Sequence, residues 1–257
     1  MTHQFLLGLL GHNIDYSLSP KTHHYWMELY GIKGKYQLYD IDPANKHTGL
    51  ESLLHRGLHG FNVTIPYKEF VFKTICPSAA RLMAVNTIYR RENGNYAAIN
   101  TDVLGGLDIF QNLQLGNKIV ILGNGGTTRG LVEIFYQLKV PQIHIVERQT
   151  KIWHSDYKNM LMFHGWEAVT DLMTEATLLI NTVPNLEFQP KNLNRDTLVC
   201  DYVYGGSESL FMTHVKKSRQ AIIPGIEFLI RQAQHSFQYW FNIFPEITPD
   251  LRRSLYR

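Results

Sequence analysis

Short apolar runs alternate with segments of helical periodicity along the chain. In the first hundred residues these runs predict strands at residues 5–10, 36–41, 58–65, 84–89 and 96–99. Pro20 suits the first turn of a helix, and Trp26, Leu29 and Tyr30 follow it at the spacing of one helical face. Residues 50–54 predict part of a second helix. The Asn93-Gly94 turn between the last two runs predicts an antiparallel hairpin, because both residues tolerate positive φ.

A plainer alternation of strands and helices begins near residue 118. Strands are expected at residues 118–122, 143–147, 178–182, 197–203 and 221–223, and a helix with a regular apolar face follows residue 126. Helical crossovers between such strands predict a parallel sheet. A long apolar-faced helix is expected at residues 228–241, with its aromatic side chains in the core. The fold class is therefore α/β, and the change of pattern at residues 102–117 suggests two domains.

Composition narrows the class of protein without naming an activity. The chain has 257 residues, of which 44% are hydrophobic and 18% charged, which suits a packed core. Its 25 basic and 22 acidic residues give a net charge of +3, too even to imply a nucleic acid or a membrane surface as partner. Two cysteines, Cys76 and Cys200, cannot form a disulfide framework, so we expect a cytoplasmic protein.

The histidine pairs carry no metal site in this interpretation. His55 and His59 have helical spacing, but Gly57 weakens a helix and the glutamate typical of a zinc motif is missing. His23 and His24 are expected at the surface or at a helix cap. No metal is therefore predicted.

A glycine-rich turn joins the strand at 118–122 to the helix that follows. Glycines in this position let phosphate groups approach the backbone N–H groups of a helix N-terminus. Thr128 stands where the usual fingerprint has its third glycine. The turn predicts a dinucleotide site formed by Gly123, Asn124, Gly125, Gly126 and Thr127.

The next strand ends in two residues that favour different cofactors. Glu147 would accept hydrogen bonds from a free ribose 2′,3′-diol and repel a 2′-phosphate, which favours NAD. Arg148 would stack on adenine or pair with the 2′-phosphate, which favours NADP. These two residues alone do not decide between NAD and NADP.

Small polar side chains follow several strands of the first domain. They are Ser17 and Ser19, Thr64 and Lys68 in the segment 62–68, Asn86, and Asp102. Open α/β sheets present ligand-binding groups at strand ends, and hydroxyls and amides suit a polyhydroxylated substrate. Lys68 and Asp102 are a plausible proton-transfer pair, since a carboxylate beside a lysine can hold its amine in place.

These motifs, in this order, resemble the shikimate dehydrogenase family over nearly the whole chain. The matching segments are residues 11–20, 62–68, 84–87, 100–102, 123–129, 201–204 and 225–232. The resemblance implies an N-terminal substrate domain, a Rossmann-type cofactor domain and a C-terminal helix that returns to the first domain. We therefore expect a catalytic domain at residues 1–102 plus 228–257 and a dinucleotide domain at 103–227. It also implies NADPH-dependent reduction of 3-dehydroshikimate to shikimate, a step of aromatic amino-acid biosynthesis.

Residue roles follow from the same resemblance. Lys68 would transfer the proton and Asp102 would orient it. The substrate would contact Ser17, Ser19, Thr64, Asn86, Asp102, Tyr204 and Gln232, and Gly225 would lie beside the cofactor. Departures from the family pattern at Glu147 and at residues 181–185 leave two alternatives open. One is a quinate/shikimate dehydrogenase that uses NAD, and the other is a non-catalytic shikimate-binding paralogue. A monomer and a homodimer are equally compatible with the sequence.

Overall fold

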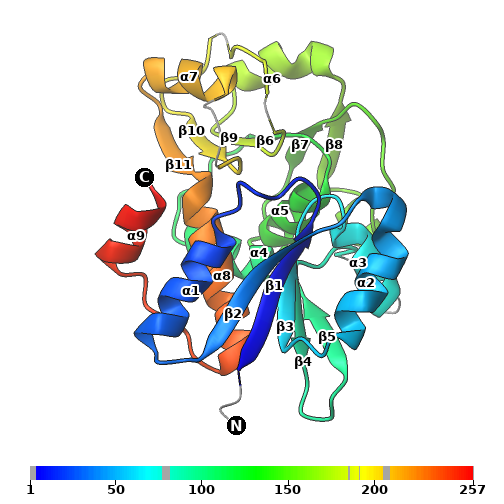
Figure 1. The fold of residues 1–257 in the computed structure, drawn as a ribbon. Coiled ribbons are helices and arrows are strands. Elements are labelled where there is room, and N and C mark those ends of the chain that lie inside the picture. The colour runs from blue at the N-terminus through cyan, green and yellow to red at the C-terminus, as the bar shows by residue number, and fades with distance from the viewer. Residues whose placement is uncertain (1–3, 77–81, 185, 191, 205–208, 257) are drawn as a thin grey trace. The chain divides into compact units, whose positions relative to one another are not determined.

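The computed structural model describes residues 4–76, 82–184, 186–190, 192–204 and 209–256. It divides into two compact units, one of Met1–Gly105 with Leu229–Arg257 and one of Gly106–Phe228. Each unit is built around its own β-sheet, and the fold is the α/β class expected from the sequence (Figure 1). Within the described residues, no helix is long and apolar enough to cross a membrane.

The first unit holds a mixed sheet of five strands in the order β2-β1-β3-β4-β5. β1, β2 and β3 are parallel, whereas β3–β4 and β4–β5 pair antiparallel. The predicted hairpin is confirmed, with Gly94 in its turn at a φ of +84°. The elements in chain order are β1 (Phe5–Gly11), α1 (Ser19–Leu29), β2 (Gly34–Asp40), a 3-10 turn (Pro43–Asn45), α2 (Lys46–His55), β3 (Gly60–Val63), α3 (Lys68–Ile75), β4 (Thr87–Arg90) and β5 (Tyr96–Ile99).

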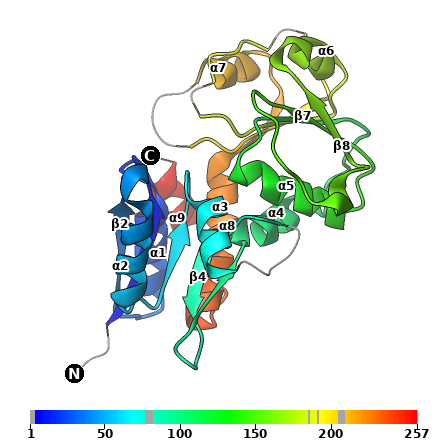
Figure 2. The same cartoon turned by 90° about the vertical axis from the view of Figure 1, so that its right-hand side faces the viewer.

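Helices cover both faces of this sheet (Figures 1 and 2). On one face, Leu50 and Leu53 of α2 and Val71 of α3 pack into an apolar cluster with Phe61 and Val63 of β3. On the other face, α1 packs against α8 (Gly225–Phe241), which returns to this unit as predicted. The C-terminal helix α9 (Pro249–Leu255), which was not predicted, also contacts α1.

The buried face of α1 differs from the prediction. Leu29 is 49% exposed and Tyr30 38% exposed, whereas His23, Trp26 and Met27 are buried. The helix ends at Leu29, and Gly31, with a φ of +64°, turns the chain away, so Leu29 and Tyr30 lie outside the packed turn. The expectation that His23 lies at the surface or at a helix cap is therefore wrong, since His23 is buried inside α1.

The second unit holds six parallel strands in the order β11-β10-β9-β6-β7-β8. Its elements are α4 (Thr101–Phe110, which begins in the first unit), β6 (Ile119–Leu122), α5 (Gly126–Gln137), β7 (Ile143–Val146), 3-10 turns Ser155–Tyr157 and Trp166–Ala168, β8 (Leu161–His164), α6 (Val169–Thr174), β9 (Leu178–Asn181), β10 (Leu198–Asp201), α7 (Leu210–Lys217) and β11 (Ala221–Pro224). Strand β8 was not predicted. Two of its four side chains, Met162 and Phe163, are exposed at the sheet edge.

The helices α6 and α7 cover one face of this sheet, and α4 and α5 cover the other (Figure 1). Leu172 and Phe211 belong to an apolar cluster with Val120 and Leu179 of the strands. On the opposite face, Phe135 of α5 packs on Phe110 of α4 with ring centroids 5.1 Å apart. The sheet order reverses direction between β6 and β9, which is where open α/β sheets bind their ligands.

Candidate functional site

Lys68 and Asp102, the predicted proton-transfer pair, are in direct contact. Lys68 is the first residue of α3 and Asp102 lies in the first turn of α4. The ammonium Nζ of Lys68 donates to Oδ2 of Asp102 over 2.6 Å. The two side chains are only 11% and 16% exposed, so water screens their attraction far less than at the surface. This is a short, charge-assisted hydrogen bond, and it fixes the position of the lysine amine.

Asn86 fixes the other oxygen of the carboxylate. Its Nδ2 donates to Oδ1 of Asp102 over 2.9 Å, and the same amide lies 3.3 Å from Oε1 of Gln232. The backbone N–H of Thr101 donates to Oδ1 of Asn86 over 2.6 Å, so Thr101 helps to orient this amide. Four predicted residues, Lys68, Asn86, Asp102 and Gln232, thus form one hydrogen-bonded group.

Gln232 reaches this group because α4 and α8 approach closely at a glycine. A Cβ on Gly105 would lie 2.6 Å from the backbone N of Gln232, closer than real Cβ contacts allow. Only glycine therefore permits this helix contact.

The predicted serines and Thr64 follow neighbouring strands. Ser17 and Ser19 come after β1, and Thr64 comes directly after β3, its parallel neighbour. The backbone N–H of Ser19 donates to Oγ of Ser17 over 3.3 Å. Thr64 packs against Gly11 at the end of β1, where a Cβ would lie 2.6 Å from Cγ2 of Thr64. None of the hydrogen bonds among the described residues joins these three side chains to Lys68.

Several residues of this site were not singled out individually from the sequence. Asn62, Thr87 and Thr101 lie in segments that were recognised, but their contacts depend on the fold. Ser236 lies in none of those segments, and its only signal is its position one helical turn after Gln232. All four are buried and polar.

The glycine-rich turn of the second unit has the geometry of a phosphate site. It joins β6 to α5, and Gly123 has a φ of +103°. A Cβ on Gly125 would meet nothing within 4 Å, so the turn is open on that side. Gly125 caps α5 without a side-chain hydrogen bond, so the first N–H groups of this helix are not covered by a capping side chain. These features fit the pyrophosphate of a dinucleotide.

Glu147 and Arg148 each have a protein partner. Nδ2 of Asn124 in the glycine turn donates to the Glu147 carboxylate, which holds that carboxylate beside the turn. The Arg148 guanidinium lies over the indole of Trp166, 5.6 Å from the ring centroid. The Glu147 carboxylate thus lies directly after β7 and beside the glycine turn.

Tyr204 and Gly225 also lie in the second unit, after β10 and at the start of α8. A Cβ on Gly225 would lie 2.7 Å from the backbone O of Asp201, so close packing requires a glycine at this position. Asp201 accepts from the backbone N–H of Val203 and from Nδ2 of Asn181, each over 3.0 Å. Burial raises the pKa of Asp201 to about 6, against the lowering effect of these two donors. Asn185, at the end of the altered segment 181–185, lies outside the described residues.

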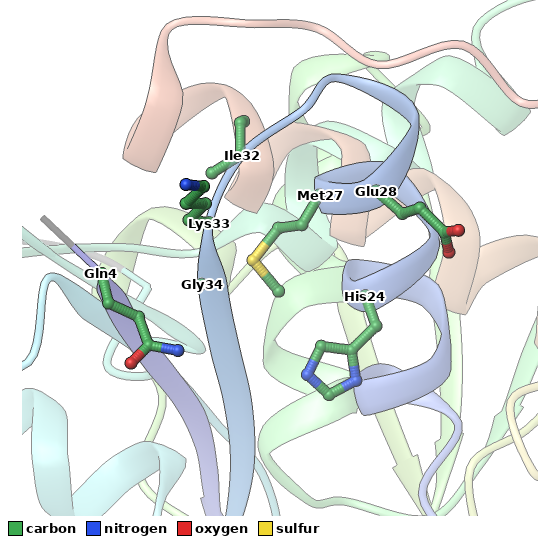
Figure 3. A pocket seen from close by; sticks show the side chains of 7 residues that line it. All are labelled: Gln4, His24, Met27, Glu28, Ile32, Lys33 and Gly34. Atoms are coloured by element: carbon green, nitrogen blue, oxygen red, sulfur yellow. The ribbon is translucent and has the colours of Figure 1, made fainter. Parts of the chain in front are cut away.

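A hollow beside α1 and two hydrogen-bonded histidines also occur in the first unit, and they include none of the predicted site residues. A hollow of about 490 Å³ lies between α1 and β2 and is drawn in Figure 3. His24, Met27 and Glu28 line it from α1. The imidazoles of His59 and His24 accept the backbone N–H groups of Leu6 and Tyr36, respectively. Among the described residues, no group of three metal-ligating side chains occurs.

Comparison with known proteins agrees with the motifs. The family model of the shikimate dehydrogenase substrate binding domain matches residues 9–88. A curated protein named shikimate dehydrogenase (NADP(+)), from Afipia carboxidovorans, is 32% identical over 95% of this chain and 94% of its own length. The chain belongs to the shikimate dehydrogenase family. The family resemblance inferred from the sequence is thereby confirmed.

Solved structures support the fold of this family member. Shikimate 5-dehydrogenase from Thermus thermophilus, solved in complex with NADP(H) and shikimate, has a TM-score of 0.80 at 24% identity, covering 98% of this chain and 100% of the other. Quinate dehydrogenase from Corynebacterium glutamicum in complex with NAD has a TM-score of 0.79 at 22% identity, covering 99% and 100%. At these identities the likeness concerns the fold.

Proposed function

We propose that this family member is an NADP-linked shikimate dehydrogenase that interconverts 3-dehydroshikimate and shikimate. The observation that carries the proposal is the 2.6 Å contact between Lys68 and Asp102, in a chain of the shikimate dehydrogenase family. A binding protein would need hydrogen bonds to its ligand but no oriented proton donor. An oriented lysine beside a carboxylate is what proton transfer to a carbonyl oxygen requires.

Lys68 is assigned the proton transfer in both directions of the reaction, reduction and oxidation. Hydride transfer to the substrate carbonyl carbon, or from the carbinol in the reverse direction, is the chemistry that a bound nicotinamide would supply. In reduction, the Lys68 ammonium gives its proton to the oxygen on which negative charge develops. In oxidation, the neutral amine takes the hydroxyl proton as the hydride leaves. Asp102 and Asn86 keep the amine in place throughout, which lowers the entropic cost of the step.

The substrate contacts are assigned by chemistry. Ser17 and Ser19 offer hydroxyl donors to the substrate carboxylate. Its ring hydroxyls are assigned to Thr64, Asn86, Asp102 and Gln232, with Tyr204 close to the ring. The domain roles follow, with substrate and catalysis in the unit of residues 1–105 and 229–257 and the dinucleotide in the unit of residues 106–228.

The dinucleotide is assigned to the glycine turn. The backbone of Gly123, Asn124, Gly125, Gly126 and Thr127 would hold the pyrophosphate, with Gly225 close by. NADP is proposed because the curated relative from Afipia carboxidovorans carries NADP(+) in its name. Arg148 would then form an ion pair with the 2′-phosphate of NADP.

A second candidate is a quinate/shikimate dehydrogenase that uses NAD. The observation that favours it is the Glu147 carboxylate, held by Asn124 beside the turn, because such a carboxylate suits a free diol. The altered segment 181–185 favours instead a non-catalytic shikimate-binding paralogue, and the intact Lys68–Asp102 pair argues against it. The thiols of Cys76 and Cys200 are free, in line with the expected cytoplasmic location.

One experiment separates these functions. Purified protein is assayed with shikimate and with quinate, each with NADP and with NAD, by the absorbance of the reduced nicotinamide. We expect turnover of shikimate with NADP. Turnover of quinate with NAD at higher kcat/KM selects the second candidate. Calorimetric binding of shikimate without turnover under any condition identifies a paralogue.

A further inference from the structure

A buried cluster of hydroxyl groups lies next to the Lys68–Asp102 pair, and the proposed reaction does not use it directly. The hydroxyl cluster consists of Thr87, Thr101 and Ser236. The Thr87 Oγ1 lies 2.9 Å from both Thr101 Oγ1 and Ser236 Oγ, and the last two are 3.0 Å apart. All three residues are fully buried. Buried hydroxyls without partners would be costly, so each must direct its single proton to a definite acceptor.

Asn62 determines the direction in which two of these hydroxyl groups donate their protons. The hydroxyl of Tyr36 donates to Oδ1 of Asn62 over 2.8 Å, so the Asn62 amide turns its hydrogens toward the hydroxyl cluster. Its Nδ2 donates to Thr87 Oγ1 and to Ser236 Oγ, each over 2.9 Å. These oxygens therefore act as acceptors on the Asn62 side, and their own protons point onward.

The onward acceptors are at Asn86 and on α8. Thr87 and Thr101 have their hydroxyls 3.2 Å and 3.1 Å from Oδ1 of Asn86, and Ser236 donates to the backbone O of Gln232 over 3.1 Å. With donors gathered around its Oδ1, the Asn86 amide must present Nδ2 to Asp102. Hydrogen bonds thus run in one direction from Tyr36 through Asn62, Thr87 and Asn86 to Asp102.

We propose that Thr87 and Ser236 are positioning residues for the catalytic pair. Thr87, together with the backbone N–H of Thr101, holds the Asn86 amide in the orientation that places Asp102 against Lys68. Ser236 fastens α8 to the same cluster, one turn after Gln232. Their contribution is made through Asn86 and Gln232, without contact with the substrate. This inference rests on the proposed function.

Thr87 allows a matched test, because valine has nearly the same shape without the hydroxyl and serine keeps the hydroxyl without the methyl. We expect Thr87→Val to lower kcat for shikimate oxidation about tenfold, since small displacements of reacting groups cost that much or more. Thr87→Ser should stay within about threefold of the wild type in kcat, and Ser236→Ala should follow Thr87→Val. With shikimate deuterated at the oxidised carbon, the isotope effect on kcat should rise in Thr87→Val, because hydride transfer becomes slower relative to product release.

A wild-type kcat in Thr87→Val, or equal losses in the valine and serine variants, would overturn the proposal. A crystal structure of Thr87→Val gives a readout that does not depend on turnover. We expect the Asn86 amide to rotate or the Lys68–Asp102 distance to exceed about 3.5 Å, the limit of a hydrogen bond. An unchanged Asn86–Asp102–Lys68 arrangement would refute the positioning role. Absence of shikimate turnover in the wild type would count against the proposed function, while the crystal comparison still decides the positioning role.

Discussion

The Lys68 ammonium lies 2.6 Å from Oδ2 of Asp102, and the two residues lie in the first turns of different helices, α3 and α4. Because each helix starts where a strand of the sheet has ended, the contact depends on the tertiary fold rather than on local sequence. If this amine moves the proton, its removal must cost activity out of proportion to stability.

Lys68→Met should therefore lower kcat by about 10²-fold or more, which is the usual contribution of a positioned acid or base. Lys73→Met is the matched control, since Lys73 lies on the same helix with an exposed side chain. It should leave kcat unchanged. The measurement is steady-state oxidation of shikimate, with unfolding midpoints recorded for both variants. Equal kcat in Lys68→Met and the wild type would contradict the assignment.

Glu147→Asn should shift cofactor preference toward NADP by about tenfold or more in the ratio of kcat/KM values. The reason is the loss of a carboxylate that repels a 2′-phosphate and accepts a ribose diol. Calorimetry with 2′,5′-ADP and with 5′-AMP tests the same change without turnover. Glu92→Asn, at the β4–β5 turn of the other unit, alters the net charge equally and should leave the preference unchanged. An unaltered ratio in Glu147→Asn would remove this residue as the discriminator.

His23 should make the protein sensitive to acid. Burial lowers the pKa of His23 to about 3, with a smaller lowering by His24 and an opposing effect of Asn62. Between pH 6.5 and about 3 the unfolded chain binds the extra proton, so the free energy of unfolding falls as pH falls, by up to about 1.4 kcal/mol per pH unit. Urea unfolding at pH 7 and pH 5 measures the slope.

In His23→Phe this part of the slope should disappear, because phenylalanine does not titrate. The ring would still pack near Tyr36, on which the imidazole stacks with centroids 4.6 Å apart. His55→Gln, at an exposed position of α2, should keep the wild-type slope. The same pH dependence in His23→Phe as in the wild type would show that other groups cause it.

Asp201 should affect the pH dependence of stability in the opposite sense to His23. Its pKa is raised by burial to about 6, so between about pH 4 and 6 the folded protein holds the extra proton and stability falls as pH rises. Asp201→Asn should stabilise the protein at pH 8 by roughly 1–3 kcal/mol, and the gain should vanish near pH 4. The asparagine oxygen can still accept from Val203 and Asn181.

Urea unfolding of Asp201→Asn and the wild type at pH 8 and pH 4.5 gives this difference directly. Asp196→Asn, in the exposed turn before β10, is the control and should change the unfolding free energy little at either pH. A destabilised Asp201→Asn at pH 8 would mean that the charge itself is needed for folding.

Local sequence patterns, formed by residues close together in the chain, predicted most of the fold. Alternating apolar runs gave nearly all strands of both sheets, and the Asn93-Gly94 turn marked the hairpin. Predictions from local periodicity were wrong where a helix ended early, as at Leu29. Strand β8 escaped prediction because it has only four residues, LMFH, which show no alternation of apolar and polar positions.

The candidate site was predicted in its parts but not in its connections. Motifs identified Lys68, Asn86 and Asp102, each within a few residues of a strand end. The hydroxyl cluster could not be inferred, because Thr87 and Ser236 are 149 positions apart and an isolated serine within a helix carries no signal of its partners. The buried His23 was missed for the same reason, since the aromatic rings around it come from distant segments.

Both passages of the chain between the two units occur inside helices. The boundary falls after Gly105 within α4 and after Phe228 within α8. Cutting the chain at either boundary would therefore sever a continuous helix instead of a loop. A recombinant fragment that begins at Leu229 would lose the first turn of the helix that carries Gln232 and Ser236. Swapping cofactor units between relatives will therefore require junctions placed outside α4 and α8.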